Sequence, residues 1–254
     1  MIQQISIENR RGNTLRGVLN LPQACDEGCR VPVWMNIHGF GGNKCGYKNL
    51  HVQQARKLEK NGIAGVRFDF FGNGESDGEF DEMTFTSLLE DAEDIFAWIK
   101  EQPWADTNHL ILSGQSMGGY VASTVAPRLQ PEKLILQCPG AAMWNGALER
   151  VEAMEAKGVY TADVEGLSFS TTFNKTMHPY EPYASARGYE GKVLLVRGTK
   201  DQLVSLADCE KYQEVYGHAC TFVSIEEGNH NFANISVRRE LEKVIIDFIL
   251  GGNR

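Results

Sequence analysis

The chain has 254 residues, of which 42% are hydrophobic, and this length is sufficient to bury one large core. Its formal net charge is −8 and it contains no long basic run, so nucleic acid and anionic membrane surfaces are disfavoured as partners. The N-terminus has no basic start followed by an apolar stretch, and every apolar run is too short to cross a bilayer. We therefore expect a soluble, cytoplasmic protein that does not bind membranes.

The first predicted elements are two short alternating segments, at residues 3–9 and 13–21, which indicate an antiparallel hairpin at a sheet edge. The chain then alternates between apolar strands and amphipathic helices. Strands are predicted at 31–37, 63–70, 110–114, 133–138, 192–198 and 220–226. Helices are predicted at 48–61, 84–101, 117–129, 206–216 and 236–249. This alternation predicts an α/β fold with a mostly parallel central sheet and helices on both faces.

Residues 140–187 interrupt this alternation. They contain one predicted helix, at 147–157, and are otherwise aromatic, polar and irregular. The segment has too many aromatic residues for a linker, so we expect it to be an inserted cap over the sheet. The predicted organisation is a core made of residues 1–139 and 188–254, with a cap at 140–187.

Six cysteines are dispersed along the chain, and a chain of this length does not need disulfides to fold. Cys25 and Cys29 have the spacing of half a zinc site, but no second Cys/His pair of suitable spacing follows them. We therefore predict structural or incidental thiols and no bound metal.

One motif carries a specific chemical prediction. Ser116 lies in the pattern G-x-S-x-G, between Gly114 and Gly118, after a predicted strand and before a predicted helix. In this context the serine occupies a sharp, strained turn that raises its hydroxyl above the sheet. The pattern therefore predicts Ser116 as a nucleophile. The simpler alternative is a serine in an ordinary glycine-rich turn.

A serine nucleophile needs a base within hydrogen-bond reach, and the base needs a group that orients it. His230 follows the last predicted strand and Asp201 follows the strand before it. Parallel strands bring these loops to one edge of the sheet, so we predict His230 as the base and Asp201 as the acid. Two other polar residues also follow strands. We expect His38 to brace its loop and Asp69 to be structural.

The developing negative charge on a substrate oxygen needs backbone N–H donors. Met117 begins the predicted helix after the serine, so its N–H faces the same space as the hydroxyl. The glycine-rich run from Ile37 to Gly42 allows backbone to approach the substrate closely. We predict the N–H groups of Met117 and Phe40 as the oxyanion hole, although a purely structural glycine-rich loop remains an alternative.

Several segments together resemble the bacterial cinnamoyl (feruloyl) esterases of the α/β-hydrolase superfamily. They are HGFGGNK, VRFDFFGNGESDGEF, MTFTSLLEDAEDIFAWIK, GQSMGG, RGTKDQLV and EEGNHNF. The resemblance covers about 31–138 and 190–250. It implies the α/β-hydrolase fold, the same triad and oxyanion donors, and a cap at 140–187 that holds the aromatic ring of the acyl group. The triad mechanism itself requires no metal or organic cofactor, so we predict none.

The cap departs from that family at the positions expected to bind the ring hydroxyl. Some members have an acidic residue early in the cap and a tyrosine later, where this chain has Gly146 and Phe173. The residues that could replace them are Asn145, Tyr160, Tyr180 and Tyr183. Trp144, Phe169 and Phe173 could form stacking walls for a substrate, or they could form the cap's own small core.

The sequence thus predicts a serine carboxylic-ester hydrolase that acts on small esters of ferulic-type or other aromatic acids. Its expected partner is a small-molecule ester, and a homodimer is left open. Other serine acyl hydrolases, such as a monoacylglycerol lipase, a thioesterase or a peptidase, are the alternative within enzymes. A non-catalytic binding protein on the same fold is the alternative from another class.

Overall fold

The computed structural model describes residues 1–23 and 29–251. Cys25, one half of the Cys25/Cys29 pair, lies outside the described residues. Among the helices of these two ranges, none combines the length and the apolar character that crossing a membrane requires.

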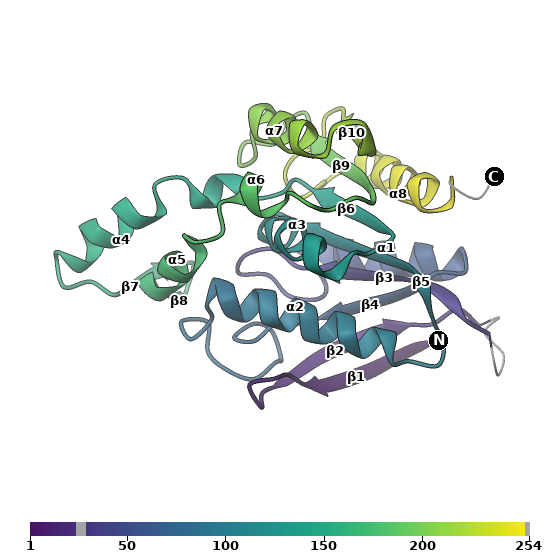
Figure 1. Cartoon of the computed structure of the whole chain (residues 1–254), viewed down its shortest axis with the longest axis horizontal. Helices are drawn as coiled ribbons and strands as arrows, with labels where there is room; N and C mark the ends of the chain where they lie inside the picture. The colour runs from purple at the N-terminus through teal and green to yellow at the C-terminus, as the bar shows by residue number, and fades with distance from the viewer. Residues whose placement is uncertain (24–28, 252–254) are drawn as a thin grey trace.

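An eight-stranded sheet forms the centre of the molecule, in the order β1-β2-β4-β3-β5-β6-β9-β10 (Figure 1). The strands are β1 (Ile2–Glu8), β2 (Thr14–Asn20), β3 (Val31–Ile37), β4 (Ala64–Phe68), β5 (Ala105–Gln115), β6 (Lys133–Gln137), β9 (Lys192–Gly198) and β10 (Cys220–Ile225). β1 and β2 pair antiparallel at one edge, and the strands from β4 to β10 pair parallel. The predicted edge hairpin and mostly parallel sheet are confirmed.

Helices cover both faces of this sheet. They are α1 (Leu50–Lys60), α2 (Phe85–Lys100), α3 (Met117–Leu129), α7 (Leu206–Tyr216) and α8 (Ile235–Leu250), all close to their predicted ranges. α1 packs against α8, whereas α2 packs against α3, and Figure 1 shows α2 crossing in front of the sheet with α1 behind it. The α/β-hydrolase fold expected from the sequence is confirmed by this topology.

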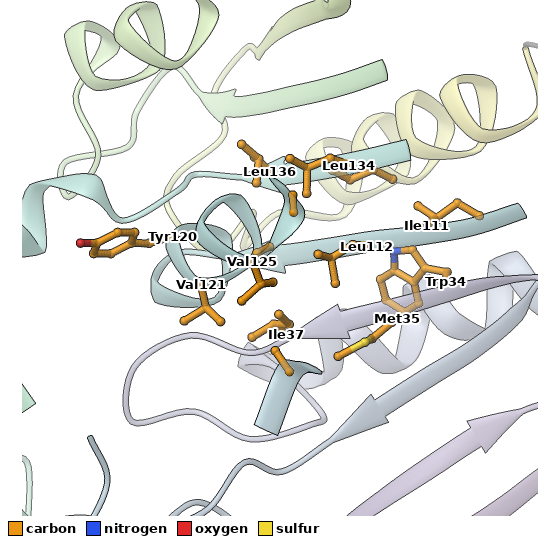
Figure 2. Packing of buried hydrophobic residues seen from close by; sticks show 14 of the residues in the cluster. Trp34, Met35, Ile37, Ile111, Leu112, Tyr120, Val121, Val125, Leu134 and Leu136 are labelled. Carbon is orange, nitrogen blue, oxygen red and sulfur yellow. The ribbon is translucent and has the colours of Figure 1, made fainter. Parts of the chain in front are cut away.

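The core lies where α3 covers the central strands (Figure 2). Val121 and Val125 of α3 face Leu112 of β5 and Ile37 of β3, and all four side chains are at most 1% exposed. Burying an aliphatic side chain of this size contributes about 1.5–3 kcal/mol, so the helix that begins at the site is held firmly on the sheet.

Residues 140–187 fold between β6 and β9. The segment contains a short 3-10 helix at Ala141–Trp144, α4 (Ala147–Glu155), a hairpin of β7 (Thr161–Val164) and β8 (Leu167–Ser170), α5 (Thr171–Met177) and α6 (Pro182–Ser185). In Figure 1, α4, β7, β8 and α5 project from one side of the sheet. The buried Ala147, Phe173 and Met177 belong to the same hydrophobic cluster as the sheet, so the segment shares a core with the rest of the chain.

Candidate active site

Ser116 occupies the turn between β5 and α3 in a strained backbone conformation, with φ 56° and ψ −122°. A β-carbon at Gly114 would lie 2.0 Å from the carbonyl oxygen of Gly118, and one at Gly118 would lie 2.2 Å from that of Ile37. Only glycine fits both positions, because the start of α3 passes so close to β5 and β3. The two glycines of the motif thus permit the turn that presents the serine hydroxyl at the sheet edge.

The structure brings the three residues selected from the sequence into one hydrogen-bonded chain. His230 Nε2 lies 3.0 Å from Ser116 Oγ, and His230 Nδ1 lies 2.9 Å from Asp201 Oδ2. The side chain of Asp201 is fully buried, and that of His230 is 13% exposed. With a proton on Nδ1 donated to the carboxylate, Nε2 is left free to accept the hydroxyl proton.

Asp201 is held as a carboxylate by its surroundings. Burial opposes the charge, but hydrogen bonds from His230, from the backbone N–H of Val204 and from Cys138 outweigh it and lower the pKa of Asp201 to about 2. A second oxygen, Oδ1, accepts from the N–H groups of Leu203 at 2.8 Å and Val204 at 3.0 Å. The carboxylate therefore stays charged and oriented at neutral pH.

This depressed pKa predicts a pH dependence of stability. The Asp201 carboxylate contributes stability fully above its ordinary value of 3.8, and loses that contribution as the pH falls toward about 2. We expect the difference in free energy of unfolding between wild type and Asp201→Asn to shrink across this window. Denaturant titrations at several pH values from about 5 downward would measure it, and a constant difference would contradict the carboxylate's assigned environment.

Gln115 and His51 form a second hydrogen-bonded pair, which contacts the backbone of His230. Gln115 Nε2 donates to the carbonyl oxygen of His230 at 3.2 Å, and Gln115 Oε1 lies 2.8 Å from His51 Nε2. His51 is 1% exposed, and burial lowers its pKa to about 3, so it is neutral and donates from Nε2. Sequence reasoning placed His51 on a helix and gave it no role. The sequence feature that could have indicated its burial is the position of His51 on the apolar face of that helix.

The glycine-rich loop after β3 lies against the serine. A β-carbon at Gly39 would be 3.3 Å from Ser116 Cβ and 3.9 Å from its Oγ. Within the described residues, the N–H groups of Phe40 and Met117 donate to no other protein group. One backbone donor in this loop and one at the start of α3 are thus left without a protein acceptor in the described residues, as an oxyanion hole would require.

The two competing polar residues have structural partners. His38 is buried, its Nδ1 lies 2.9 Å from the carbonyl oxygen of Gly39, and its Nε2 accepts from the N–H of Phe70 at 3.3 Å. Asp69 accepts from the backbone N–H of Lys44 at 2.6 Å, from its ammonium at 2.5 Å and from the N–H of Glu75 at 2.9 Å. These contacts agree with the expected bracing role of His38 and structural role of Asp69.

An aromatic cluster joins the Phe40 loop to residues 140–187. The ring of Phe40 lies edge-on to Phe169 at 4.9 Å, to Phe80 at 5.2 Å and to Phe173 at 6.1 Å between centroids. Phe173 has no exposed surface, so in this structure its ring packs between loop and insertion and leaves no face for a substrate. Phe169 is only partly buried. The cluster is thus shared between insertion and core, whereas the sequence allowed for a separate cap core.

The other residues proposed for substrate binding differ in exposure. Trp144 is half-buried, stacks on His178 at 5.6 Å between centroids and donates from Nε1 to the His178 carbonyl at 2.9 Å. Asn145 is exposed, and its carbonyl accepts from Arg150 at 2.6 Å. Tyr160 is 62% exposed, and its backbone carbonyl accepts from the N–H of Thr171. Within residues 1–23 and 29–251, none of these three side chains forms a hydrogen bond with the triad.

Tyr180 and Tyr183, two of the residues considered for binding the ring hydroxyl, form hydrogen bonds within the protein. The hydroxyl of Tyr183 donates to Asp208 at 3.0 Å, and the backbone carbonyl of Tyr180 accepts from Tyr120. The Tyr183 hydroxyl is therefore already satisfied within the protein.

Cys138 adds a third potential metal ligand beside the triad. Ligand atoms of Cys138, Asp201 and His230 all lie within 4.8 Å of one another, and this donor set suits zinc. However, the carboxylate and imidazole are hydrogen-bonded to each other, and burial raises the pKa of the Cys138 thiol well above its ordinary value. A metal here would have to break that bond and deprotonate the thiol.

The fold and this site define a serine hydrolase of the α/β-hydrolase fold. The chain belongs to the Hydrolase_4 family, described as serine aminopeptidase, S33, which matches residues 33–164, just over half of the chain.

The chain is also similar to solved structures and to curated proteins. The structure of Est1E from Butyrivibrio proteoclasticus with ferulic acid bound superposes with a TM-score of 0.83, at 23% identity, over 97% of this chain and 98% of that one. Mouse palmitoyl-protein thioesterase ABHD10 is 27% identical over 69% of this chain and 60% of its own length. The uncharacterized 31.7 kDa protein in the traX-finO intergenic region of Escherichia coli is 31% identical over 41% of this chain. The match spans about a third of the length of that relative.

Proposed function

We propose that the protein is a serine carboxylic-ester hydrolase with Ser116, His230 and Asp201 as its catalytic triad. The observation that carries the proposal is the pair of contacts at 3.0 Å and 2.9 Å that link hydroxyl, imidazole and carboxylate at one edge of the sheet. This order of groups is the one required to activate a serine near neutral pH.

The mechanism follows from the positions of these groups. Ser116 Oγ attacks the acyl carbonyl while His230 Nε2 accepts its proton. The N–H groups of Phe40 and Met117 hold the oxyanion of the tetrahedral intermediate. His230 then protonates the leaving alcohol, and a water molecule activated by the same imidazole cleaves the acyl-enzyme.

We further propose esters of hydroxycinnamic or other aromatic acids as substrates, with residues 140–187 acting as the cap. The support is the aromatic character of this segment and the fold similarity to Est1E, whose structure contains ferulic acid. Half-buried Trp144 and Phe169 are two aromatic residues of the insertion with surface left for a ring to contact.

A substrate panel tests the substrate class. Methyl ferulate, chlorogenate, short p-nitrophenyl esters, a monoacylglycerol, a palmitoyl thioester and an aminoacyl substrate would be compared by kcat/KM. We expect the highest value for the hydroxycinnamates. A maximum on the thioester, the monoacylglycerol or the aminoacyl substrate would replace the proposed substrate with that class and leave the serine mechanism intact.

Fluorophosphonate labelling separates an enzyme from a non-catalytic scaffold. We expect a single covalent adduct on Ser116, identified by mass spectrometry, and no adduct on Ser116→Ala. An intact protein that resists labelling at every serine would contradict a working triad.

The two kinds of aromatic residue in the insertion should respond differently to substitution. We expect Trp144→Ala to change KM differently for aromatic and aliphatic esters. We expect Phe173→Leu to lower the thermal midpoint and reduce kcat about equally on all esters, because it loosens the packing of Phe40. A selective loss of hydroxycinnamate turnover in Phe173→Leu would instead place that ring against the substrate.

A further inference from the structure

A groove lies between α1 and α8, and none of the triad residues Ser116, Asp201 and His230 lines it. Its volume is about 640 Å³, within the range of roughly 300–1,000 Å³ common for small-molecule sites. Six of its lining residues are cations: Lys48, Arg56, Lys57, Lys60, Arg238 and Arg239. We call this cavity the α1–α8 groove.

The positive charge of the α1–α8 groove is largely uncompensated. The one acidic residue of the lining is Glu242, which lies 3.9 Å from Lys57. In the part of the chain that the structure describes, Arg56, Lys60 and Arg239 form no ion pair and no side-chain hydrogen bond. Gathering like charges without counter-charges costs stability, so the groove is suited to an anion that neutralises them.

Arg238 is held rigidly at this groove. Its guanidinium donates to the carbonyl oxygens of Phe232 at 3.1 Å, Lys48 at 2.9 Å and Tyr47 at 2.9 Å, and to Gln53 Oε1 at 3.2 Å. None of these four partners is a carboxylate, so the charge is fixed in place without being neutralised. A preformed positive charge lowers the entropy cost of binding an anion.

We propose that the α1–α8 groove binds a small polyphosphate-bearing molecule. The chain as a whole carries a net charge of −8 even with these cations counted, so the surface beyond the groove would repel a long nucleic acid or an anionic membrane, whereas a short anion meets only the cations. Self-association through this face would bring two sets of six cations together, which opposes a symmetric dimer. Exposed Tyr47 and Ile235 line the same groove and provide apolar surface for an organic part such as a nucleoside.

Isothermal titration with tripolyphosphate and with ATP tests the proposal on the full chain. We expect both to bind one site per chain, with affinity that falls as salt rises, and the double variant Arg56→Glu/Arg239→Glu to weaken binding at least tenfold. Tighter binding of ATP would identify a nucleotide-like ligand, and equal binding would identify polyphosphate chemistry alone. Ester hydrolysis should be unchanged in this variant, which keeps the test independent of the proposed function.

Lys243→Glu provides the matched control. Lys243 is exposed on α8 but does not line the groove, so the same type of charge reversal should change affinity less than twofold. The proposal would be overturned by absent binding, by an equal loss in Lys243→Glu, or by binding to anionic phospholipid vesicles when neither phosphate compound binds.

Discussion

Ser116→Ala should lower kcat by roughly 10⁴–10⁶-fold while the protein remains folded, because the variant lacks the nucleophile that forms the acyl-enzyme. The residual rate would come from the oxyanion donors and substrate binding alone. Steady-state kinetics on the best ester of the panel, with circular dichroism to verify folding, would measure the effect.

The size of the decrease in kcat shows whether Ser116 or another group is the nucleophile. Ser113 provides a matched control, because it lies in β5 just before the Ser116 turn, is fully buried and accepts a hydrogen bond from Gln137 at 3.1 Å. Ser113→Ala should change kcat little. A decrease under tenfold in Ser116→Ala would mean that another group carries out the attack.

Asp201→Asn should reduce kcat by about 10³–10⁴-fold, because an amide in place of the carboxylate no longer fixes the imidazole tautomer that leaves Nε2 free. The loss should fall mainly on kcat, since Asp201 lies behind His230 and on the far side from Ser116. Kinetics across a pH series would show the changed titration of the base.

Asp69→Asn is the comparison for the acid. Asp69 holds Lys44 and the backbone of Glu75, so its replacement should lower stability more than the rate per folded molecule. If the folded Asp69→Asn protein were inactive and Asp201→Asn active, the assignment of the acid would be wrong.

Hydrophobic periodicity was sufficient for most of the sheet and its helices, because these elements bury apolar residues at regular spacing. It failed where burial is uneven. β5 begins at Ala105 rather than at 110, because Thr107 and Asn108 are exposed and hide the first half of the strand. The hairpin of β7 and β8 was also missed, since each strand has only four residues, too few for the alternation in TADV and LSFS to stand out, and none of these residues is fully buried.

The positions of Ser116, Asp201 and His230 could be selected from sequence because each directly follows a recognisable strand, and parallel strands end at one edge. Contacts between side chains that are far apart in the sequence could not be predicted in this way. The hydrogen bonds that link His51, Gln115 and His230 depend on how α1 packs on the sheet. The burial of Phe173 depends on how the insertion packs against the Phe40 loop.

The edge-on packing of Phe40 against Phe169 and Phe173 couples the loop after β3 to the insertion that we propose as the cap. A bulky substrate group that displaced Phe169 would tilt the ring of Phe40. The backbone N–H of Phe40, the proposed oxyanion donor, would then move relative to Ser116. Discrimination between acyl groups would then be expressed in the rate of bond cleavage as well as in the strength of binding. Changes in the insertion that adapt it to other substrates would have to preserve the packing of Phe40 against Phe169 and Phe173, or position the Phe40 N–H by another contact.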